Sequence, residues 1–274
     1  MSKVWFITGA NRGFGLEFAK AALLRGDRVA ATSRHASGLD LLVAQFGDRV
    51  RPLTLDVTDR AGVNRAVEMA VSYFGGLDVV VNNAGYGLFG AVEEISEQQL
   101  RDQIEVNLFG VFHVTQAVLP VLRRQGRGHI VQISTVGGVV SFPSLGGYHA
   151  SKWALEGLTE SLAQEVAPFG IKTTLVEPGP FGTDWSGSSA VFATPMPEYD
   201  HLRADMQARA AQLPPSFNGK PEAAGGALLK LVDAEQPPLR VFFGVMPGHV
   251  VPAIYEARLK TWQDWAALSA QANG

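Results

Sequence analysis

The sequence predicts a three-layer α/β fold, in which a doubly wound parallel sheet of about seven strands carries helices on both faces. Short runs of apolar, β-branched residues alternate along the chain with longer stretches of helical periodicity. The apolar runs lack the in-and-out alternation of a half-exposed sheet, as expected for parallel strands covered on both faces. Strand–helix alternation of this kind produces right-handed crossovers and places helices on both sides of the sheet.

Seven segments have the length and composition of such strands. They are residues 3–8, 28–33, 50–55, 77–82, 128–134, 172–177 and 239–243. Helical periodicity is strongest in residues 15–25, 60–74, 96–124 and 148–169. Although 274 residues exceed the ~100–200 of a typical domain, α/β folds reach about 250 as one unit, so we expect one domain over residues 1–274.

Composition and charge exclude several classes of protein. Hydrophobic residues make up 46% and charged residues 18%, unlike a disordered or fibrous chain. A net charge of −3 gives no basic surplus for nucleic acid, and the absence of cysteine excludes disulfides and thiol chemistry. We expect no metal site. No apolar run approaches the ~20 residues of a membrane span and no signal peptide is evident, so we expect a soluble cytoplasmic protein.

Two segments depart from the alternation of strands and helices. Residues 180–221 are rich in Gly, Ser, Pro and aromatic residues, with no recognisable strand and a short helical pattern at residues 199–212. Because long irregular segments in compact domains are usually functional, we interpret this one as a substrate lid, with a passive surface insertion as the alternative. Residues 252–267 predict an amphipathic terminal helix that covers the core or contacts another subunit.

The first predicted strand runs directly into the glycine-rich sequence TGANRGFG, residues 8–15, and then into a helix. Glycine lets a backbone turn sharply and approach a pyrophosphate closely, and the N-terminus of the following helix favours negative charge. An ordinary tight turn is the alternative, but the strand–loop–helix context is the one that the dinucleotide motif requires. The residues expected to hold a dinucleotide here are Gly9, Asn11, Arg12, Gly13, Phe14 and Gly15.

The end of the second strand indicates which dinucleotide binds. An acidic residue at this position would accept hydrogen bonds from ribose hydroxyls, whereas arginine pairs with a 2′-phosphate. Here the strand ends in Ser33 and Arg34, with no acid, and Arg12 can approach from the glycine loop. Two guanidinium groups suit a dianionic phosphate, so the sequence favours NADP(H) over NAD(H).

These motifs, together with others further along, resemble those of the short-chain dehydrogenase/reductase family over nearly the whole chain. The matching pieces are TGANRGFG, Leu55-Asp56-Val57, Asn82-Asn83-Ala84-Gly85, Asn107, Tyr148-His149-Ala150-Ser151-Lys152 and Pro178-Gly179. Within the family the chain looks most like the hydroxysteroid and retinol dehydrogenase branch and its bacterial relatives. The resemblance implies a Rossmann fold and an oxidoreductase that acts on an alcohol or carbonyl group.

The resemblance also implies roles for individual residues. Asp56 and Val57 would hold the adenine, and Asn83, Ala84 and Gly85 would line the ribose channel. The residues implied at the nicotinamide end are Pro178, Gly179, Phe181 and Thr183. Asn107 would hold a water molecule that links a catalytic lysine to solvent.

Tyr148 and Lys152 are four residues apart at a predicted helix start, so their side chains share one face. A phenol with a pKa near 10 is a poor acid at neutral pH, and an adjacent ammonium group stabilises its phenolate. In the context of the glycine loop we interpret the pair as catalytic, with Tyr148 as the acid or base. Lys152 would also bind the nicotinamide ribose.

The residue that would hydrogen-bond the substrate oxygen departs from the family pattern. The family places serine thirteen residues before its tyrosine, where this chain has Thr135, with Ser134 next to it. A threonine hydroxyl can donate the same bond, and neighbouring strand residues face opposite ways, so we assign the role to Thr135 and keep Ser134 as the alternative. His149 could donate a proton, although a spectator role is the simpler interpretation.

The sequence thus predicts an NADP(H)-dependent carbonyl reductase or alcohol dehydrogenase. A nucleotide-binding sensor without catalysis is the alternative, and a sugar-nucleotide epimerase or dehydratase fits the glycine spacing less well. Aromatic residues in the lid, together with Phe89, Phe142, Leu145 and Trp153 near the expected mouth, indicate an apolar or aromatic substrate. Family members often associate through two long central helices, so we expect a homodimer or homotetramer.

Overall fold

Seven parallel strands form the central sheet, which confirms the predicted fold class. In this computed structural model, residues 2–183, 185 and 187–273 are described. The strand order is β3-β2-β1-β4-β6-β7-β9, and every neighbouring pair runs parallel. The strands are β1 (Val4–Ile7), β2 (Arg28–Ser33), β3 (Val50–Thr54), β4 (Val79–Asn82), β6 (Gly128–Ile133), β7 (Ile171–Pro178) and β9 (Arg240–Phe243).

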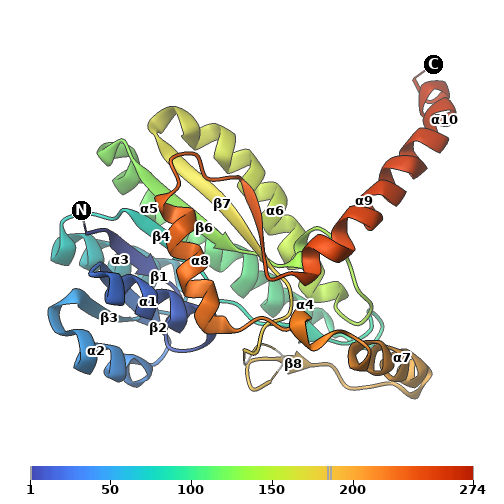
Figure 1. Ribbon diagram of the computed structural model, residues 1–274, viewed down its shortest axis with the longest axis horizontal. Coiled ribbons are helices and arrows are strands. Elements are labelled where there is room, and N and C mark those ends of the chain that lie inside the picture. The colour runs from blue at the N-terminus through green and yellow to red at the C-terminus, as the bar shows by residue number, and fades with distance from the viewer. Residues whose placement is uncertain (1, 184, 186, 274) are drawn as a thin grey trace.

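Helices cover both faces of this sheet (Figure 1). One face packs against α1 (Gly13–Arg25), α2 (Asp40–Phe46) and α8 (Pro221–Asp233). The other packs against α3 (Arg60–Phe74), α5 (Gly110–Gln125) and α6 (Gly146–Val166). The remaining helices are α4 (Glu97–Ile104), α7 (Asp200–Ala211), α9 (Met246–Asp264) and α10 (Ala266–Gln271).

Strand β1 shows how the two cores form. Trp5 and Ile7 face the α1 side and Phe6 faces the α3 side, and all three side chains are fully buried. Burying a side chain of this size stabilises the fold by about 1.5–3 kcal/mol. The Trp5 indole Nε1 also donates to Asp27 Oδ2 at 2.8 Å, which satisfies the polar group of the buried ring.

Two predicted elements differ from those in the structure, and two helices were not predicted. The helical segment expected at residues 96–124 consists of α4, a π-helical turn η3 (Glu105–Phe109) and α5. Helices α2 and α8 were not predicted, because α8 contains an adjacent glycine pair and α2 is only 7 residues long. The terminal helix begins at Met246, six residues earlier than expected, and is interrupted at Trp265 before α10.

The segment predicted as a lid is attached to the body of the protein at two places. A two-residue strand β8 (Val191–Phe192) pairs in parallel with β5 (Leu88–Phe89), although no strand was expected there. Arg203 of α7 forms an ion pair with Glu94, whose carboxylate also accepts a hydrogen bond from Met196 N at 2.8 Å. The backbone hydrogen bonds from Met196 and Ala91, together with the ion pair, lower the pKa of Glu94 to about 2.

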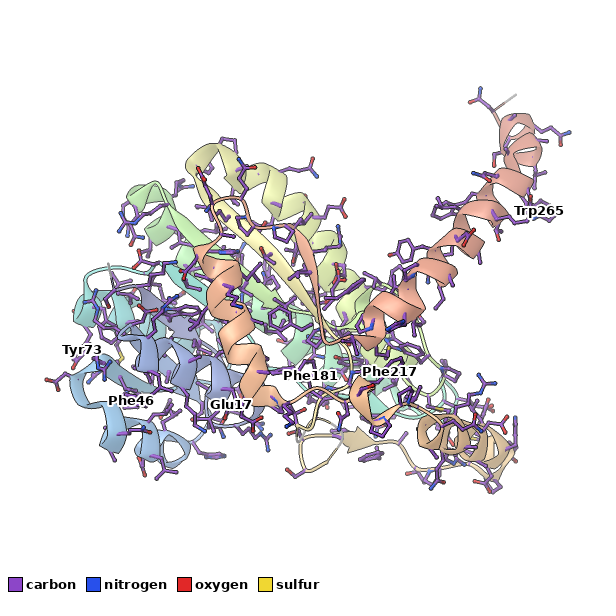
Figure 2. The ribbon with its side chains drawn as sticks, viewed as in Figure 1. Glu17, Phe46, Tyr73, Phe181, Phe217 and Trp265 are labelled. Carbon is purple, nitrogen blue, oxygen red and sulfur yellow. The ribbon has the colours of Figure 1, made fainter. Side chains whose placement is uncertain are left out.

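Helices α9 and α10 extend away from the body of the protein, with Trp265 far from the sheet (Figures 1 and 2). Trp262 is 68% and Trp265 62% exposed, so this part of the predicted terminal helix does not cover the core. Arg258 attaches the base of the arm, because its guanidinium lies 5.0 Å from the Trp153 ring and donates to Val139 O at 2.8 Å.

One helical segment in the described part of the chain, Glu97–Gln125, is long and apolar enough by length and composition alone to cross a membrane. We expected no such segment from the sequence. Core helices of soluble proteins pass the same test, and Val114, Val118 and Leu122 of this segment are buried against the sheet.

Candidate functional site

A cleft of about 720 Å³ lies at the carboxyl ends of the strands, where ligands bind in open α/β sheets. It brings together 19 of the 21 residues that the sequence assigned to catalysis and cofactor binding; Gly15 and Asn107 do not line it. The cleft-lining residues before position 100 are Gly9, Asn11, Arg12, Gly13, Phe14, Ser33, Arg34, Asp56, Val57, Asn83, Ala84 and Gly85. Those after position 100 are Thr135, Tyr148, Lys152, Pro178, Gly179, Phe181 and Thr183.

The glycine loop has a geometry that larger residues would disturb. Gly9 and Gly13 have φ values of +64° and +52°, a region that residues with a side chain rarely adopt. A Cβ on Gly15 would lie 2.2 Å from Gly9 O, so helix α1 can approach the loop only with glycine there. Gly15 therefore supports the cleft from behind, and the N-terminus of α1 opens toward it.

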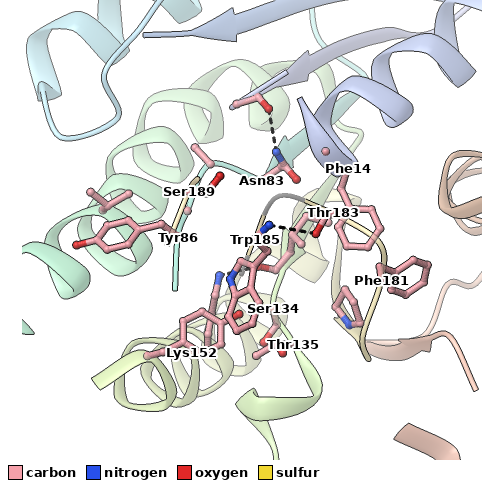
Figure 3. A pocket seen from close by; sticks show the side chains of 18 of the residues that line it. Phe14, Asn83, Tyr86, Ser134, Thr135, Lys152, Phe181, Thr183, Trp185 and Ser189 are labelled. Carbon is pink, nitrogen blue, oxygen red and sulfur yellow. Dashed lines mark hydrogen bonds between the residues drawn. The ribbon is translucent and has the colours of Figure 1, made fainter. Parts of the chain in front are cut away.

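Asn83 and Thr8 connect this loop to strand β4. The Thr8 hydroxyl oxygen accepts hydrogen bonds from Asn83 N at 2.9 Å and Ala84 N at 3.0 Å. The Asn83 amide Nδ2 donates to Thr8 O at 2.9 Å and to Gly9 O at 3.1 Å. Asn83 thus holds the glycine loop by its side chain (Figure 3).

The groups predicted to choose the cofactor lie at the rim of the cleft. Arg12 and Arg34 are both exposed there. Ser33 is buried, and its hydroxyl donates to His35 O at 2.5 Å, which shapes the turn that carries Arg34. Asp56 Oδ1 accepts hydrogen bonds from Thr58 N at 2.9 Å and Thr58 Oγ1 at 2.7 Å, so one of its carboxylate oxygens is engaged within its own turn.

Tyr148 and Lys152 lie on the first turns of α6, and both are buried. Burial raises the pKa of Tyr148, and the hydrogen bond from Thr135 lowers it. Burial lowers the pKa of Lys152 to about 8, against the charge of Glu156, which raises it. Lys152 Nζ donates to Ile133 O at 2.8 Å, so its ammonium group is held at the end of β6. Desolvation therefore outweighs the stabilisation of the phenolate that the sequence led us to expect.

The two hydroxyl groups after β6 face different partners. Ser134 Oγ donates to Glu156 Oε1 at 2.5 Å, in a buried contact. Thr135 Oγ1 accepts from Gly137 N at 3.2 Å and hydrogen-bonds Tyr148. This arrangement supports Thr135 rather than Ser134 as the partner of the substrate oxygen.

His149 and Asn107 both have internal partners. His149 Nε2 accepts from Phe142 N at 3.0 Å, and burial lowers the pKa of the imidazole, which favours a neutral spectator. Asn107 lies in the π-helical turn, a feature often found at functional sites. Its amide Nδ2 donates to Tyr86 O at 3.0 Å, and its Oδ1 accepts from Tyr86 N at 3.1 Å.

Glycine at position 85 lets Asn107 and Lys152 approach the same point of the chain. A Cβ on Gly85 would lie 2.9 Å from Asn107 Oδ1 and 3.9 Å from Lys152 Nζ. Asn107 is therefore behind the cleft wall rather than in it.

Aromatic side chains form one wall of the cleft. The Trp185 ring lies 5.0 Å from the Tyr148 ring and 5.1 Å from the Phe89 ring, measured between centroids. Phe181 instead packs edge-on against Phe14 at 4.8 Å. Of the four residues expected near the mouth, Phe142 and Leu145 line the cleft. Phe89 packs against Trp185 without lining the cleft, and Trp153 lies against Arg258 of the C-terminal arm.

Several lining residues were not identified from the sequence. They are Leu55, Tyr86, Val106, Ile133, Val136, Gly137, Pro180, Ser189, Val191 and Met246. Most of these residues are apolar and carry no chemical signal of their own. Ile133 is the last residue of β6, and Met246 lies three residues after the end of β9. The rule that ligands lie beyond the carboxyl ends of strands could therefore have found both residues.

Comparison with known proteins gives a consistent family assignment. The family profile described as "short chain dehydrogenase" matches residues 3–191. The chain is 46% identical to "Oxidoreductase BOA17" of Botryotinia fuckeliana, over 98% of each chain. It is 37% identical to a "3-ketodihydrosphingosine reductase" of Bacteroides thetaiotaomicron, over 95% of this chain and 93% of the relative.

Solved structures agree with this assignment. A short-chain dehydrogenase from Streptomyces avermitilis has a TM-score of 0.91 at 38% identity and covers 99% of this chain and 98% of its own. A short chain dehydrogenase from Burkholderia cenocepacia in complex with NADP has a TM-score of 0.76 at 27% identity, with coverages of 96% and 97%.

The geometry of the glycine loop leads to the first prediction. Gly15→Ala places a Cβ on Gly9 O, which must push α1 away from the loop, so we expect a loss of dinucleotide affinity of 10-fold or more by fluorescence titration. Gly26→Ala is a control at the other end of α1, where a Cβ meets nothing within 4 Å, although its φ of +98° costs stability. Unchanged affinity in the Gly15 variant, with weaker binding in the control, would contradict the role of the loop.

Proposed function

The chain belongs to the short-chain dehydrogenase family and is an oxidoreductase, and we propose that it uses NADP(H) to interconvert an apolar or aromatic carbonyl compound and its alcohol. The observation that carries the proposal is the arrangement at the end of β6. There the Thr135 hydroxyl bonds the Tyr148 phenol and Lys152 is held beside it, while Ser134 bonds Glu156.

The described residues fit a nicotinamide dinucleotide. In the glycine loop, a Cβ at Gly9 or Gly15 would crowd the neighbouring atoms. The absence of side chains at these two positions supports phosphate binding at the N-terminus of α1. The exposed guanidinium groups of Arg12 and Arg34 support a preference for the 2′-phosphate of NADP(H). The Burkholderia structure, described as a complex with NADP, is consistent with this preference.

When bound, the nicotinamide would supply a hydride to the carbonyl carbon or remove one from the alcohol carbon. Tyr148 would donate the proton to the carbonyl oxygen, or accept it in the reverse direction. Thr135 would hydrogen-bond the same oxygen and orient the phenol, and Lys152 would bind the nicotinamide ribose and favour the phenolate by its charge. Asp56 and Val57 would hold the adenine.

The remaining assignments complete the cofactor site. Asn83, Ala84 and Gly85 would line the ribose channel, and Pro178, Gly179, Phe181 and Thr183 would contact the nicotinamide end. Asn107 would link Lys152 to solvent. The aromatic wall around Trp185 supports an apolar substrate and restricts water at the reacting atoms.

We further propose one domain with a substrate lid at residues 180–221, and a soluble, cytoplasmic homodimer or homotetramer. Exposed apolar residues on the outer faces of the long central helices support self-association, since Phe109 is 45% and Trp153 41% exposed. The relative named as a 3-ketodihydrosphingosine reductase supports reduction of a keto group.

Turnover of a substrate panel tests the proposal against a non-catalytic sensor. We expect purified protein to consume NADPH with some members of a panel of apolar ketones, aldehydes and quinones. Tyr148→Phe removes the proton donor but keeps the ring, so turnover should fall about 100-fold or more while NADPH affinity stays nearly constant. Tight NADPH binding without any turnover would favour the sensor, and an active Phe variant would move the proton donor elsewhere, to His149 first.

Arg34→Ala tests the cofactor preference. Removing a charge-assisted contact to the 2′-phosphate should raise the KM for NADPH by about one to two orders of magnitude and leave that for NADH little changed. If the wild-type protein prefers NADH, Arg34 at the end of β2 does not select NADP(H), whatever the variant does.

Thr135→Val tests the substrate-oxygen donor. The change preserves the branched shape and removes the hydroxyl, so turnover should fall by roughly 100- to 1,000-fold, as for an oxyanion donor. Thr135→Ser keeps the hydroxyl and should retain most of the activity. Loss of turnover in Ser134→Ala, together with an active Thr135→Val enzyme, would identify Ser134 as the donor.

A further inference from the structure

A cluster of buried charged residues lies behind the catalytic pair and has no role in the mechanism described above. It consists of Glu156 on α6, Glu177 on β7 and Arg240 on β9. Both carboxylates are buried, with exposures of 5% and 2%. Arg240 Nε donates to Glu156 Oε2 at 2.9 Å, and a second nitrogen of Arg240 donates to the exposed Glu160 at 2.7 Å.

Two features place Glu156 near Lys152. The two residues are four apart on α6, so their side chains share a face of the helix. Lys152 Nζ donates to Ile133 O, and Glu156 Oε1 accepts from the hydroxyl of the next residue, Ser134. Neighbouring residues at the end of β6 therefore hold the ammonium and the carboxylate close together in a buried region.

Burial raises the pKa of both carboxylates, and hydrogen bonds oppose this effect at Glu156. Glu156 accepts one hydrogen bond at each oxygen, from Ser134 and from Arg240. Glu177 Oε1 has no hydrogen-bond partner among the described residues and lies 3.6 Å from Arg240 Nε. Burial and the neighbouring charge of Glu156 raise the pKa of Glu177 to about 8, so Glu177 is largely protonated at neutral pH.

We propose that Glu156 is a positioning residue of the active site, whose buried carboxylate is the counter-charge that keeps Lys152 protonated at neutral pH. The proposal rests on the catalytic role of Lys152 given above. Its physical basis is that burial alone favours a neutral amine, and a nearby negative charge opposes that effect.

The charges around Lys152 support this assignment. Helix α6 presents Tyr148 and Glu156, β7 presents Glu177, and β9 presents Arg240. Of these groups, Glu156 is the one whose charge raises the pKa of Lys152. Glu156 is thus the ionised acid that compensates for the burial of Lys152, whose pKa lies at about 8.

Glycine at position 138 also leaves room for the Glu156 carboxylate. A Cβ on Gly138, in the turn η4 (Val136–Gly138), would lie 2.5 Å from Ser134 Oγ and 3.0 Å from Glu156 Oε1. The turn that carries Thr135 into the cleft can therefore pack on the Ser134–Glu156 pair only with glycine there.

The test is a direct measurement of the Lys152 pKa by NMR of the full-length protein labelled at lysine ¹³Cε, with the signal assigned by its loss in Lys152→Met. We expect Glu156→Gln to lower the titration midpoint of Lys152 by about one pH unit, because the ammonium loses its counter-charge. Glu160→Gln is the matched control, since it is one turn further along α6, binds the same arginine and is exposed; it should leave the midpoint unchanged.

Two further variants keep the test decisive. In Glu156→Gln, Glu177 can ionise in place of Glu156, so the shift should be largest in the Glu156→Gln, Glu177→Gln double variant. If Glu156→Gln does not fold, Glu156→Asp keeps the charge and should hold the midpoint near that of wild type. A wild-type midpoint in both the single and the double Gln variants would overturn the proposal.

Enzyme activity provides a separate readout. With a substrate from the panel, the alkaline limb of the pH profile of kcat should move to lower pH in Glu156→Gln by the same amount as the NMR midpoint. Absence of turnover in wild-type protein would refute the proposed function but leave the NMR result intact. A shifted NMR midpoint with an unshifted alkaline limb would show that Lys152 protonation does not control turnover, and would refute the positioning role.

Discussion

The hydroxyl of Thr8 joins the two central strands where their loops separate, and the cofactor side of the cleft depends on that contact. Strands β1 and β4 are adjacent and parallel, so the segments that follow them leave the sheet at the same edge. Two backbone N–H groups after β4 bond the Thr8 oxygen, and the Asn83 amide returns two bonds to the backbone of Thr8 and Gly9. The side chains of Thr8 and Asn83, each directly after its strand, thus fix the separation of the two loops. The opening between the loops remains available for a ligand.

On the catalytic side the dominant effect is desolvation. Tyr148, Lys152, Glu156 and Glu177 are all buried near the ends of β6 and β7, where a charge without a partner is costly. Burial shifts the pKa of the phenol, the amine and both acids in the direction that favours the neutral form. Hydrogen bonds to the phenol and to Glu156 oppose this shift. The protonation of this site is therefore set by a few contacts rather than by solvent.

Sequence patterns predicted the seven strands and the glycine loop, and nearly all the residues that they assigned to the site line the cleft, because strand periodicity and the phosphate loop are local signals. They failed where tertiary contacts decide the outcome. The π-helical turn at Asn107 depends on the backbone of Tyr86, which its amide binds. Strand β8 exists because β5 is available to pair with it, and the burial of Lys152 depends on how β6 and α6 pack. None of these contacts has a signature in the residues next to it.

The same packing explains why the chain can carry threonine where the family expects serine. Ser134 and Thr135 both line the cleft, but their hydroxyl groups have different partners. Glu156 takes the Ser134 hydroxyl toward the buried cluster, and that leaves Thr135 to face Tyr148. The γ-methyl of Thr135 limits the rotamers of its hydroxyl, which orients the donor at the cost of space for the substrate. The orientation of the Ser134 hydroxyl is therefore set by Glu156, one helical turn beyond Lys152, and not by the strand itself.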